Sequence, residues 1–322
     1  MTTRSVVRVL APALVAAGLL TASASATAAA PKTCNGEKAL CSRTLDKVVL
    51  ATTHNAMSAA SLGWSIPNQQ VGIPEQLKAG IHGLLFDTYY AYKTADGKVS
   101  DVDAKVPLPA GATKQVYLCH VSCGIGATPL KDVLTAFAKH IKKNPNNVFV
   151  VVNEDYVTPK DFAAVVKSSG LLKYVYRGKT TGTWPTLSTM IRKKQQVVIL
   201  SEGHSGVKIS GIPWYHLAYD GTVQETPYSW DTAPLITDPA NWAASCRPNR
   251  GGTKGKLFLM NHWAPTFAPT PAGSEIVNAT DALVGRAKEC GAVRGKLPNL
   301  VAVDMFQSGG LFAAVKQLNA LK

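Results

Sequence analysis

The stretch "VVLATTHNAM", residues 48–57, is an apolar run that ends abruptly in a histidine followed by an asparagine. Similar runs rich in valine, isoleucine and leucine recur along the 322-residue chain, each followed by turn residues. They occupy residues 47–54, 80–87, 115–120, 147–155, 196–203, 214–221, 256–263 and 299–306. Near-continuous apolar runs of this length are typical of parallel strands that are covered on both faces.

Helical patterns lie between many of these runs. They cover residues 130–143, 159–169, 186–194, 274–289 and 309–322, and the clearest is 130–143, whose apolar side chains fall on one stripe. Strands that alternate with helices predict a parallel α/β fold, and about eight strands favour a TIM-like (β/α)8 barrel over an open sheet. No G-x-G-x-x-G motif follows the first run, which disfavours dinucleotide binding.

The first 30 residues predict a secretory signal peptide. Arg4 and Arg8 precede a short apolar run at 9–20, and repeated A-x-A sites predict cleavage between Ala24 and Ala30. The run is shorter than the roughly 18 to 20 residues of a membrane-spanning helix, so a retained interfacial anchor is the alternative. We therefore expect a secreted protein with no transmembrane segment and one catalytic domain over residues 31–322.

Six cysteines suit an exported protein, because disulfides persist outside the cytoplasm. Their spacing suggests the pairs Cys34–Cys41 and Cys119–Cys123, which leaves Cys246–Cys290, although the sequence alone permits other connectivities. The segment "CHVSC", residues 119–123, also suggests zinc. No second pair of ligands completes such a site, so the disulfide interpretation is favoured.

The formal net charge of +14 favours anionic partners. The lysines are scattered, the longest basic run is "RKK" at 192–194, and no nucleic-acid-binding motif is present, so we expect no nucleic-acid partner. An anionic lipid surface or a phosphorylated substrate fits an exported basic protein better. The alternative is that the charge serves solubility alone.

Polar groups that move protons or bind metals stand at the ends of the apolar runs. They are His54, Asn55, Asp87, His120, Glu154, Glu202, Asn261, His262 and Asp304. A single histidine or aspartate at such a place is more often a turn or cap residue. A ring of them at the carboxyl ends of barrel strands, where the chemistry of such barrels lies, instead indicates acid/base catalysis near neutral pH.

The motifs "THNAM" (53–57), "FDTYY" (86–90), "LCH" (118–120) and "VVVNED" (150–155), in this order, resemble the catalytic X region of phosphatidylinositol-specific phospholipase C. The resemblance extends through "LFLMNHW" (257–263) and "NLVAVDMF" (299–306). It implies an irregular, incompletely closed TIM barrel. It also implies a monomeric enzyme that cleaves the bond between phosphate and diacylglycerol at a membrane surface, through attack of the inositol 2-hydroxyl and a cyclic phosphate product.

The same resemblance implies roles for individual residues. His54 matches the histidine that serves as base toward the attacking hydroxyl or stabilises the transition state, and His120 matches the one that protonates the leaving oxygen. Asp304 matches an aspartate that orients the first histidine, and a cap for the following helix is the alternative. Glu202, His262 and Trp263 are expected to bind the substrate in the pocket; packing is the alternative for the last two.

Asn55, Asp87 and Glu154 match three ligands of the calcium-dependent branch, and all three supply the hard oxygen donors that Ca²⁺ prefers. Two departures weaken the match. Leu85 stands where that branch has an acidic ligand, and Tyr89 stands where the metal-independent branch has an arginine. With no charge at either position, the remaining donors favour a calcium-assisted enzyme.

Two other functions stay open. One is a related barrel phosphodiesterase that acts on another phospholipid or on a glycerophosphodiester. The other is a lipid- or glycan-binding barrel that has lost its activity, which the missing acid at position 85 keeps open. The remaining histidines, His82, His140, His204 and His216, are expected to be structural.

Overall fold

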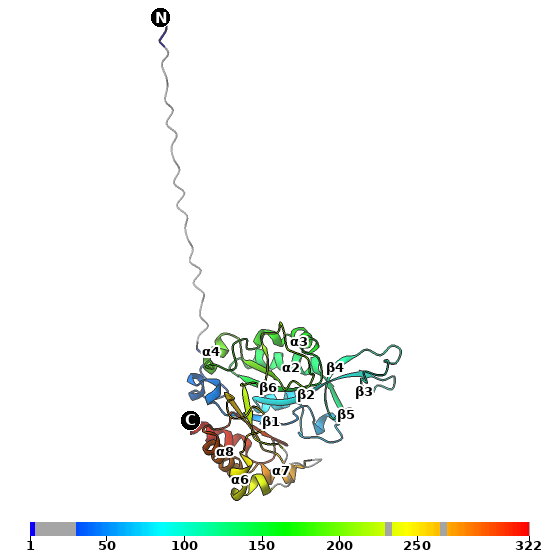
Figure 1. Ribbon diagram of the computed structural model, residues 1–322, viewed down its shortest axis with the longest axis vertical. Helices are drawn as coiled ribbons and strands as arrows, with labels where there is room; N and C mark the ends of the chain where they lie inside the picture. Colours follow the sequence, from blue (N-terminus) through cyan, green and yellow to red (C-terminus); the bar gives the residue numbers. More distant parts are fainter. Residues whose placement is uncertain (4–29, 229–233, 265–268, 322) are drawn as a thin grey trace.

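The structure is a computed structural model that describes residues 1–3, 30–228, 234–264 and 269–321. The predicted signal peptide therefore lies almost wholly outside the described residues. Eight parallel strands form one curved sheet in the order β8-β7-β6-β2-β1-β11-β10-β9 (Figure 1). The end strands β8 and β9 do not pair with each other, so the barrel is incompletely closed, which confirms the predicted fold class.

The barrel strands are short, with one exception. They are β1 (Leu50–Thr53), β2 (Gly83–Lys93), β6 (Phe149–Asp155), β7 (Val197–Ser201), β8 (Tyr215–Leu217), β9 (Val223–Glu225), β10 (Leu257–Asn261) and β11 (Leu300–Val303). Their side chains alternate between two buried apolar clusters. Val150 and Val152 of β6 join one cluster, and Phe149 and Val151 join the other, because successive side chains of a strand point to opposite faces. Both faces of the sheet are therefore covered.

Helices cover the outside of the sheet, with α2, α3 and α4 on one side in Figure 1 and α6, α7 and α8 on another. The α-helices are α1 (Ile73–Ala79), α2 (Leu130–Lys143), α3 (Pro159–Ser168), α4 (Leu187–Arg192), α5 (Pro234–Thr237), α6 (Pro239–Ser245), α7 (Pro271–Val277), α8 (Thr280–Arg294) and α9 (Leu311–Ala320). Short 3₁₀ turns occupy Ala39–Ser42, Leu45–Lys47, Ala60–Leu62 and Leu171–Tyr174. The helix expected at 274–289 is two helices, since α7 ends at Val277 and α8 begins at Thr280. None of the helices in the described part of the chain has the length and apolarity needed to cross a bilayer.

The run at 115–120 is not a barrel strand, which corrects the prediction. It forms β4 (Gln115–His120), which pairs antiparallel with the outer part of β2 and with β5 (Ser122–Pro129). Together with β3 (Val99–Asp101) these strands project from the barrel (Figure 1). The eighth barrel strand is instead β9, whose sequence Val-Gln-Glu holds a single apolar residue and gives no apolar run.

The contact between β1 and β2 requires a glycine. Thr52 is the register partner of Gly83, and a Cβ atom at position 83 would lie 2.1 Å from the Thr52 Oγ1 atom. Only a residue without a side chain allows this approach. The close contact keeps β1 and the first half of β2 side by side, and with them His54, which follows β1, and Asp87 of β2.

The three expected disulfides are confirmed: Cys34–Cys41, Cys119–Cys123 and Cys246–Cys290, with no free cysteine among the described residues. The last joins α8 to the residue that follows α6, and both of its cysteines are fully buried. It therefore anchors the C-terminal helices to one another across a long stretch of chain.

We predict that the Cys246→Ala/Cys290→Ala variant loses more stability than the Cys34→Ala/Cys41→Ala variant. The two bonds span sequence separations of 44 and 7 residues, and a longer loop loses more entropy in the cross-linked unfolded chain. The expected losses in the free energy of unfolding are about 4 and about 2.5 kcal/mol. Urea unfolding of both variants measures this order, and equal losses would contradict it.

Candidate active site

The carboxyl ends of the barrel strands surround a pocket of about 150 Å³, hereafter the central pocket. Its lining includes His54, Asn55, Leu85, Asp87, Glu154, Glu202, His204, Tyr228, Arg250, Asn261 and Trp263. Six of the nine predicted site residues are in this lining, and two more, His120 and Asp304, are hydrogen-bonded to residues in it. The structure thus brings together groups that lie up to 250 positions apart in the sequence.

His54 follows β1 and forms a carboxylate–imidazole pair with Asp304, which follows β11. The distance from the His54 Nδ1 atom to the Asp304 Oδ1 atom is 2.8 Å, and Asn68 donates a second hydrogen bond of 3.2 Å to the same oxygen. Gly310, not Asp304, stands at the start of α9, so the alternative that Asp304 caps this helix is wrong. The indole of Trp263 stacks on the His54 ring, with centroids 3.7 Å apart and planes inclined by 2°. Asp304 therefore holds the edge of the imidazole, and Trp263 covers one of its faces.

His120 forms a second pair of the same kind. Its Nδ1 atom lies 3.0 Å from the Asp87 Oδ2 atom, and its Nε2 atom lies 3.3 Å from the Asn55 Nδ2 atom. Asp87 is on β2 and His120 ends β4, which runs back along β2, so the antiparallel pairing returns the histidine to the mouth of the barrel. Asn55 directly follows His54 in the sequence and contacts His120, so it links the two histidines.

Burial and neighbouring charges shift the proton affinities of this pair. Burial raises the pKa of Asp87 to about 6; the hydrogen bond from His120 opposes the rise, and the charge of Glu154 adds to it. Burial lowers the pKa of His120, but the hydrogen bond and charge of Asp87 and the charges of Glu154 and Asp304 oppose it, and the net pKa of His120 is raised. His120 therefore retains a proton to higher pH than a free imidazole does.

The turn that carries His120 is closed by the Cys119–Cys123 disulfide. Within it, Val121 has a φ of 63°, a left-handed conformation that a β-branched residue rarely adopts, and its side chain is 73% exposed. Asp101 of β3 accepts hydrogen bonds from Ser122 and from the Cys123 amide. The disulfide and these bonds fix the backbone on both sides of the imidazole.

The three proposed calcium ligands all line the central pocket. Asp87 and Glu154 are register partners on β2 and β6, and Asn55 contacts His120, which is bonded to Asp87. Glu154 accepts a hydrogen bond from the Tyr156 hydroxyl and forms no ion pair with any described residue. Two neighbouring carboxylates and one amide fit a hard cation in donor chemistry. Nevertheless, in the described part of the chain no three His, Cys, Asp or Glu side chains are grouped as a metal site.

Arg250 is a pocket residue that the sequence analysis missed. Its guanidinium donates to Glu202 and to the fully buried Glu225, with an Nε to Oε1 distance of 2.7 Å to the latter. Glu202 also lies 3.2 Å from the His204 Nε2 atom, so His204 belongs to the pocket rather than to the structural histidines. Arg250 lies outside every apolar run, so its position in the sequence gives no signal. Glu225 is the last residue of the short β9 and thus stands at a strand end, as the predicted site residues do.

His262 does not lie in the pocket, which corrects its predicted place. It is fully buried, and its Nε2 and Nδ1 atoms contact the Val277 carbonyl oxygen and the Arg286 Nη1 atom at 2.8 and 3.2 Å. Successive residues after β10 point to opposite sides, so Asn261 and Trp263 reach the pocket while His262 points under α8. Burial lowers the pKa of His262 to about 3, so it stays neutral.

A family model described as PI-PLC X matches residues 107–319, more than half of the chain. The chain belongs to the PI-PLC X family. The matched segment begins after His54, Asn55 and Asp87.

Relatives agree with this membership. The chain is 25% identical over 312 residues to an uncharacterized secreted protein of Arthroderma benhamiae and 22% identical over 302 residues to a PI-PLC X domain-containing protein of Arabidopsis thaliana. These alignments cover 89% and 85% of this chain but only 63% and 62% of the relatives, so the chain spans less than two thirds of their length.

Solved structures show the same fold. A phosphatidylinositol-specific phospholipase C from Listeria monocytogenes superposes with a TM-score of 0.53 at 17% identity, over 88% of this chain and 95% of that one. A variant of the Staphylococcus aureus enzyme gives a TM-score of 0.50 at 14% identity, over 86% and 93%. The curved, incompletely closed barrel is therefore the architecture shared with these enzymes.

We predict that Asp87→Asn lowers the pKa of His120. The substitution removes the charge and weakens the hydrogen bond that raise this pKa, and burial, which lowers it, remains. Titration of the His120 ring protons by NMR measures the change. Asp304→Asn is the control, because Asp304 makes the smallest contribution to the His120 pKa. Equal shifts in the two variants would refute the assignment.

Proposed function

We propose that the protein is a phosphodiesterase that cleaves phosphatidylinositol between phosphorus and the diacylglycerol oxygen, with the inositol 2-hydroxyl as nucleophile. The observation that carries the proposal is that two carboxylate–histidine pairs, His54–Asp304 and His120–Asp87, meet at the mouth of one pocket. Phosphoryl transfer needs one group that takes a proton from the nucleophile and another that gives a proton to the leaving oxygen.

His54 is the base in this scheme. An ionised carboxylate can only accept, so the hydrogen bond to Asp304 places the proton of neutral His54 on its Nδ1 atom. The Nε2 atom is then free to accept a proton from the 2-hydroxyl. Asp304 and the stacked Trp263 keep the ring in one orientation, and the carboxylate stabilises the imidazolium that forms.

His120 is the acid. Its pKa is raised, which favours the protonated ring, and the Nε2–H group donates a proton to the diacylglycerol oxygen as the bond to phosphorus breaks. After the transfer, neutral His120 carries its proton on Nδ1, toward Asp87, and its Nε2 atom accepts from the Asn55 amide, which is the contact in the structure. Asn55 therefore stabilises the state that follows proton donation.

Calcium is the proposed cofactor, with Asn55, Asp87 and Glu154 as its ligands. When bound, such an ion neutralises phosphate charge and makes the 2-hydroxyl more acidic. Ca²⁺ takes about six to eight oxygen ligands, and these three side chains are fewer than that. Leu85 offers no further oxygen. Arg250 does not replace the ion, because its charge is balanced by Glu202 and Glu225.

We place the activity outside the cell at an anionic membrane surface. The three disulfides, the predicted signal peptide and the secreted relative support this location. The net positive charge supports attraction to anionic phospholipids.

We predict that His54→Ala and His120→Ala each lower kcat on phosphatidylinositol by on the order of 10²–10⁴-fold. A p-nitrophenyl ester of inositol phosphate separates the two roles, because its leaving group needs no proton. His120→Ala should then lose much less activity on this substrate than on the lipid, whereas His54→Ala should lose as much on both.

His140→Ala is the matched control, because His140 lies on α2, outside the central pocket. Full activity in either pocket variant would rule out the two-histidine mechanism. Equal losses of His120→Ala on both substrates would remove its role as acid. An unmodified protein that cleaves no phosphodiester would indicate a lipid- or glycan-binding barrel, and one that cleaves only other phosphodiesters would indicate another headgroup.

We predict that a calcium chelator lowers the rate of phosphatidylinositol cleavage and that Asp87→Asn and Glu154→Gln weaken Ca²⁺ binding by at least tenfold. Isothermal titration with Ca²⁺ measures binding separately from activity. Glu202→Gln is the control for binding, because its carboxylate is held by Arg250 and is not a proposed ligand. Unchanged activity in chelator together with no measurable Ca²⁺ binding would remove the metal and leave the histidine chemistry intact.

A further inference from the structure

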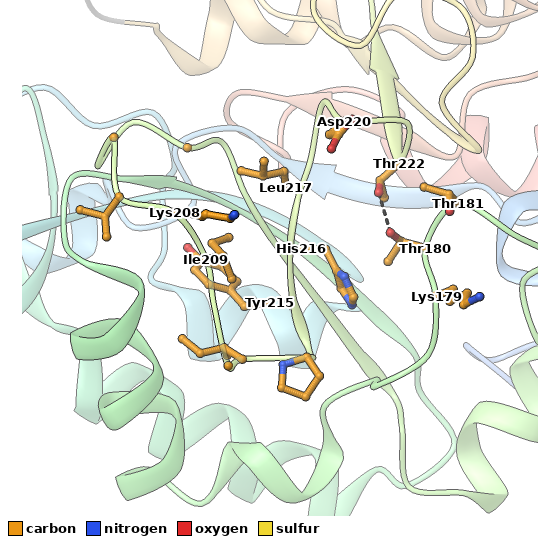
Figure 2. Close-up of a pocket in the computed structure, with 16 residues that line it drawn as sticks. Lys179, Thr180, Thr181, Lys208, Ile209, Tyr215, His216, Leu217, Asp220 and Thr222 are labelled. Atoms are coloured by element: carbon orange, nitrogen blue, oxygen red, sulfur yellow. Dashed lines mark hydrogen bonds between the residues drawn. The ribbon is translucent and has the colours of Figure 1, made fainter.

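A second cavity, of about 820 Å³, lies against β8 at the open edge of the barrel (Figure 2). We call it the seam pocket; residues of the segments 179–181, 203–213, 215–217 and 220–222 line it. Gly203 lines the seam pocket, while its neighbours Glu202 and His204 line the central pocket. One short segment after β7 therefore separates the two cavities.

The seam pocket is basic. Lys179 and Lys208 approach it from different segments, and in Figure 2 the His216 side chain lies between them and points toward the Lys179–Thr181 side. The Nε2 atom of His216 is buried and has no hydrogen-bond partner among the described residues, and neither lysine forms an ion pair with one of them. Among the described residues of the lining, Asp220 is the one that is acidic. Two lysines and a histidine therefore share the lining with a single carboxylate.

Hydroxyl groups add neutral hydrogen-bonding capacity. The Thr180 and Thr222 Oγ1 atoms lie 2.7 Å apart and are buried, which ties the loop before α4 to the start of β9 (Figure 2). Thr181 stands beside them in the lining. Lysine ammonium groups with nearby hydroxyl and imidazole donors are the groups that bind a phosphate oxygen.

The rim of the seam pocket is apolar. Val207 and Leu217 are 49% and 43% exposed, and Val207 is adjacent to Lys208 in the sequence. Large exposed apolar side chains beside a lysine suit the boundary between lipid headgroups and acyl chains, where the lysine meets phosphate and the apolar groups meet hydrocarbon. Free phosphate in solution would need no such rim.

We propose that the seam pocket binds the phosphate of an anionic phospholipid that is not the substrate. A lipid held there lies beside the segment 202–204, which also borders the central pocket. The site is independent of the proposed cleavage of phosphatidylinositol, because none of its lining residues takes part in the histidine chemistry.

The test is binding of the full chain to phosphatidylcholine vesicles with and without phosphatidylglycerol, neither of which is the proposed substrate. Lys179→Gln/Lys208→Gln should weaken binding to the anionic vesicles on the order of thirtyfold, since a lysine near an anionic surface contributes about 1 kcal/mol. Lys139→Gln/Lys167→Gln is the matched control, because both lysines are exposed on α2 and α3, outside the pocket. His216→Phe, which changes no lysine, should weaken binding several-fold.

Inorganic phosphate distinguishes the sources of the ligand. We expect it to shift the His216 NMR signals in a saturable way and to compete with anionic vesicles. Equal losses of binding in the two double-lysine variants would overturn the proposal, because surface charge alone would explain them. Phosphate that shifts His216 but leaves vesicle binding unchanged would also overturn it, since the pocket would then hold a soluble anion.

Discussion

The register of β2 is the constraint on which the site depends. Its first half pairs in parallel with β6, so that Asp87 and Glu154 are direct partners, and its second half leaves the barrel and pairs antiparallel with β4. A shift of either pairing by one residue would turn the side chains to the opposite face. The same strand thus places a carboxylate pair inside the mouth and returns His120 to one member of that pair.

Charge balance explains how the mouth of the barrel holds so many ionisable groups. A buried carboxylate without a partner is strongly unfavourable, and most of the acids here have one: Asp304 has His54, Asp87 has His120, and Glu225 has Arg250. Glu154 is the exception: within the described part of the chain, its one hydrogen-bond partner is the Tyr156 hydroxyl. The unpaired charge lies beside Asp87, whose pKa it helps to raise, and this wall of the pocket is where a cation would relieve repulsion.

Much of the fold was predictable because parallel strands buried on both faces leave a strong apolar signal. Seven of the eight predicted runs contain barrel strands, and the spacing of the cysteines predicted every disulfide. The run at 115–120 misled because apolar content does not reveal strand direction, and an antiparallel partner of β2 buries the same side chains as a parallel one would. β9 was missed because two of its three residues are polar, so it leaves no apolar run.

The site was predictable where a functional group ends a strand, because strand order then fixes its position in space. Arg250 could not be found in this way, since it lies on a loop and its role comes from two acids, Glu202 and Glu225, on different strands. His262 failed for the opposite reason: it lies at the right end of β10 but one residue out of phase with the pocket. A strand end alone therefore identifies the layer of the barrel in which a residue lies. The direction in which its side chain points follows from the alternation of side chains along the strand. By that criterion Asn261 and Trp263 face the central pocket, while His262 points to the opposite side and contacts Arg286.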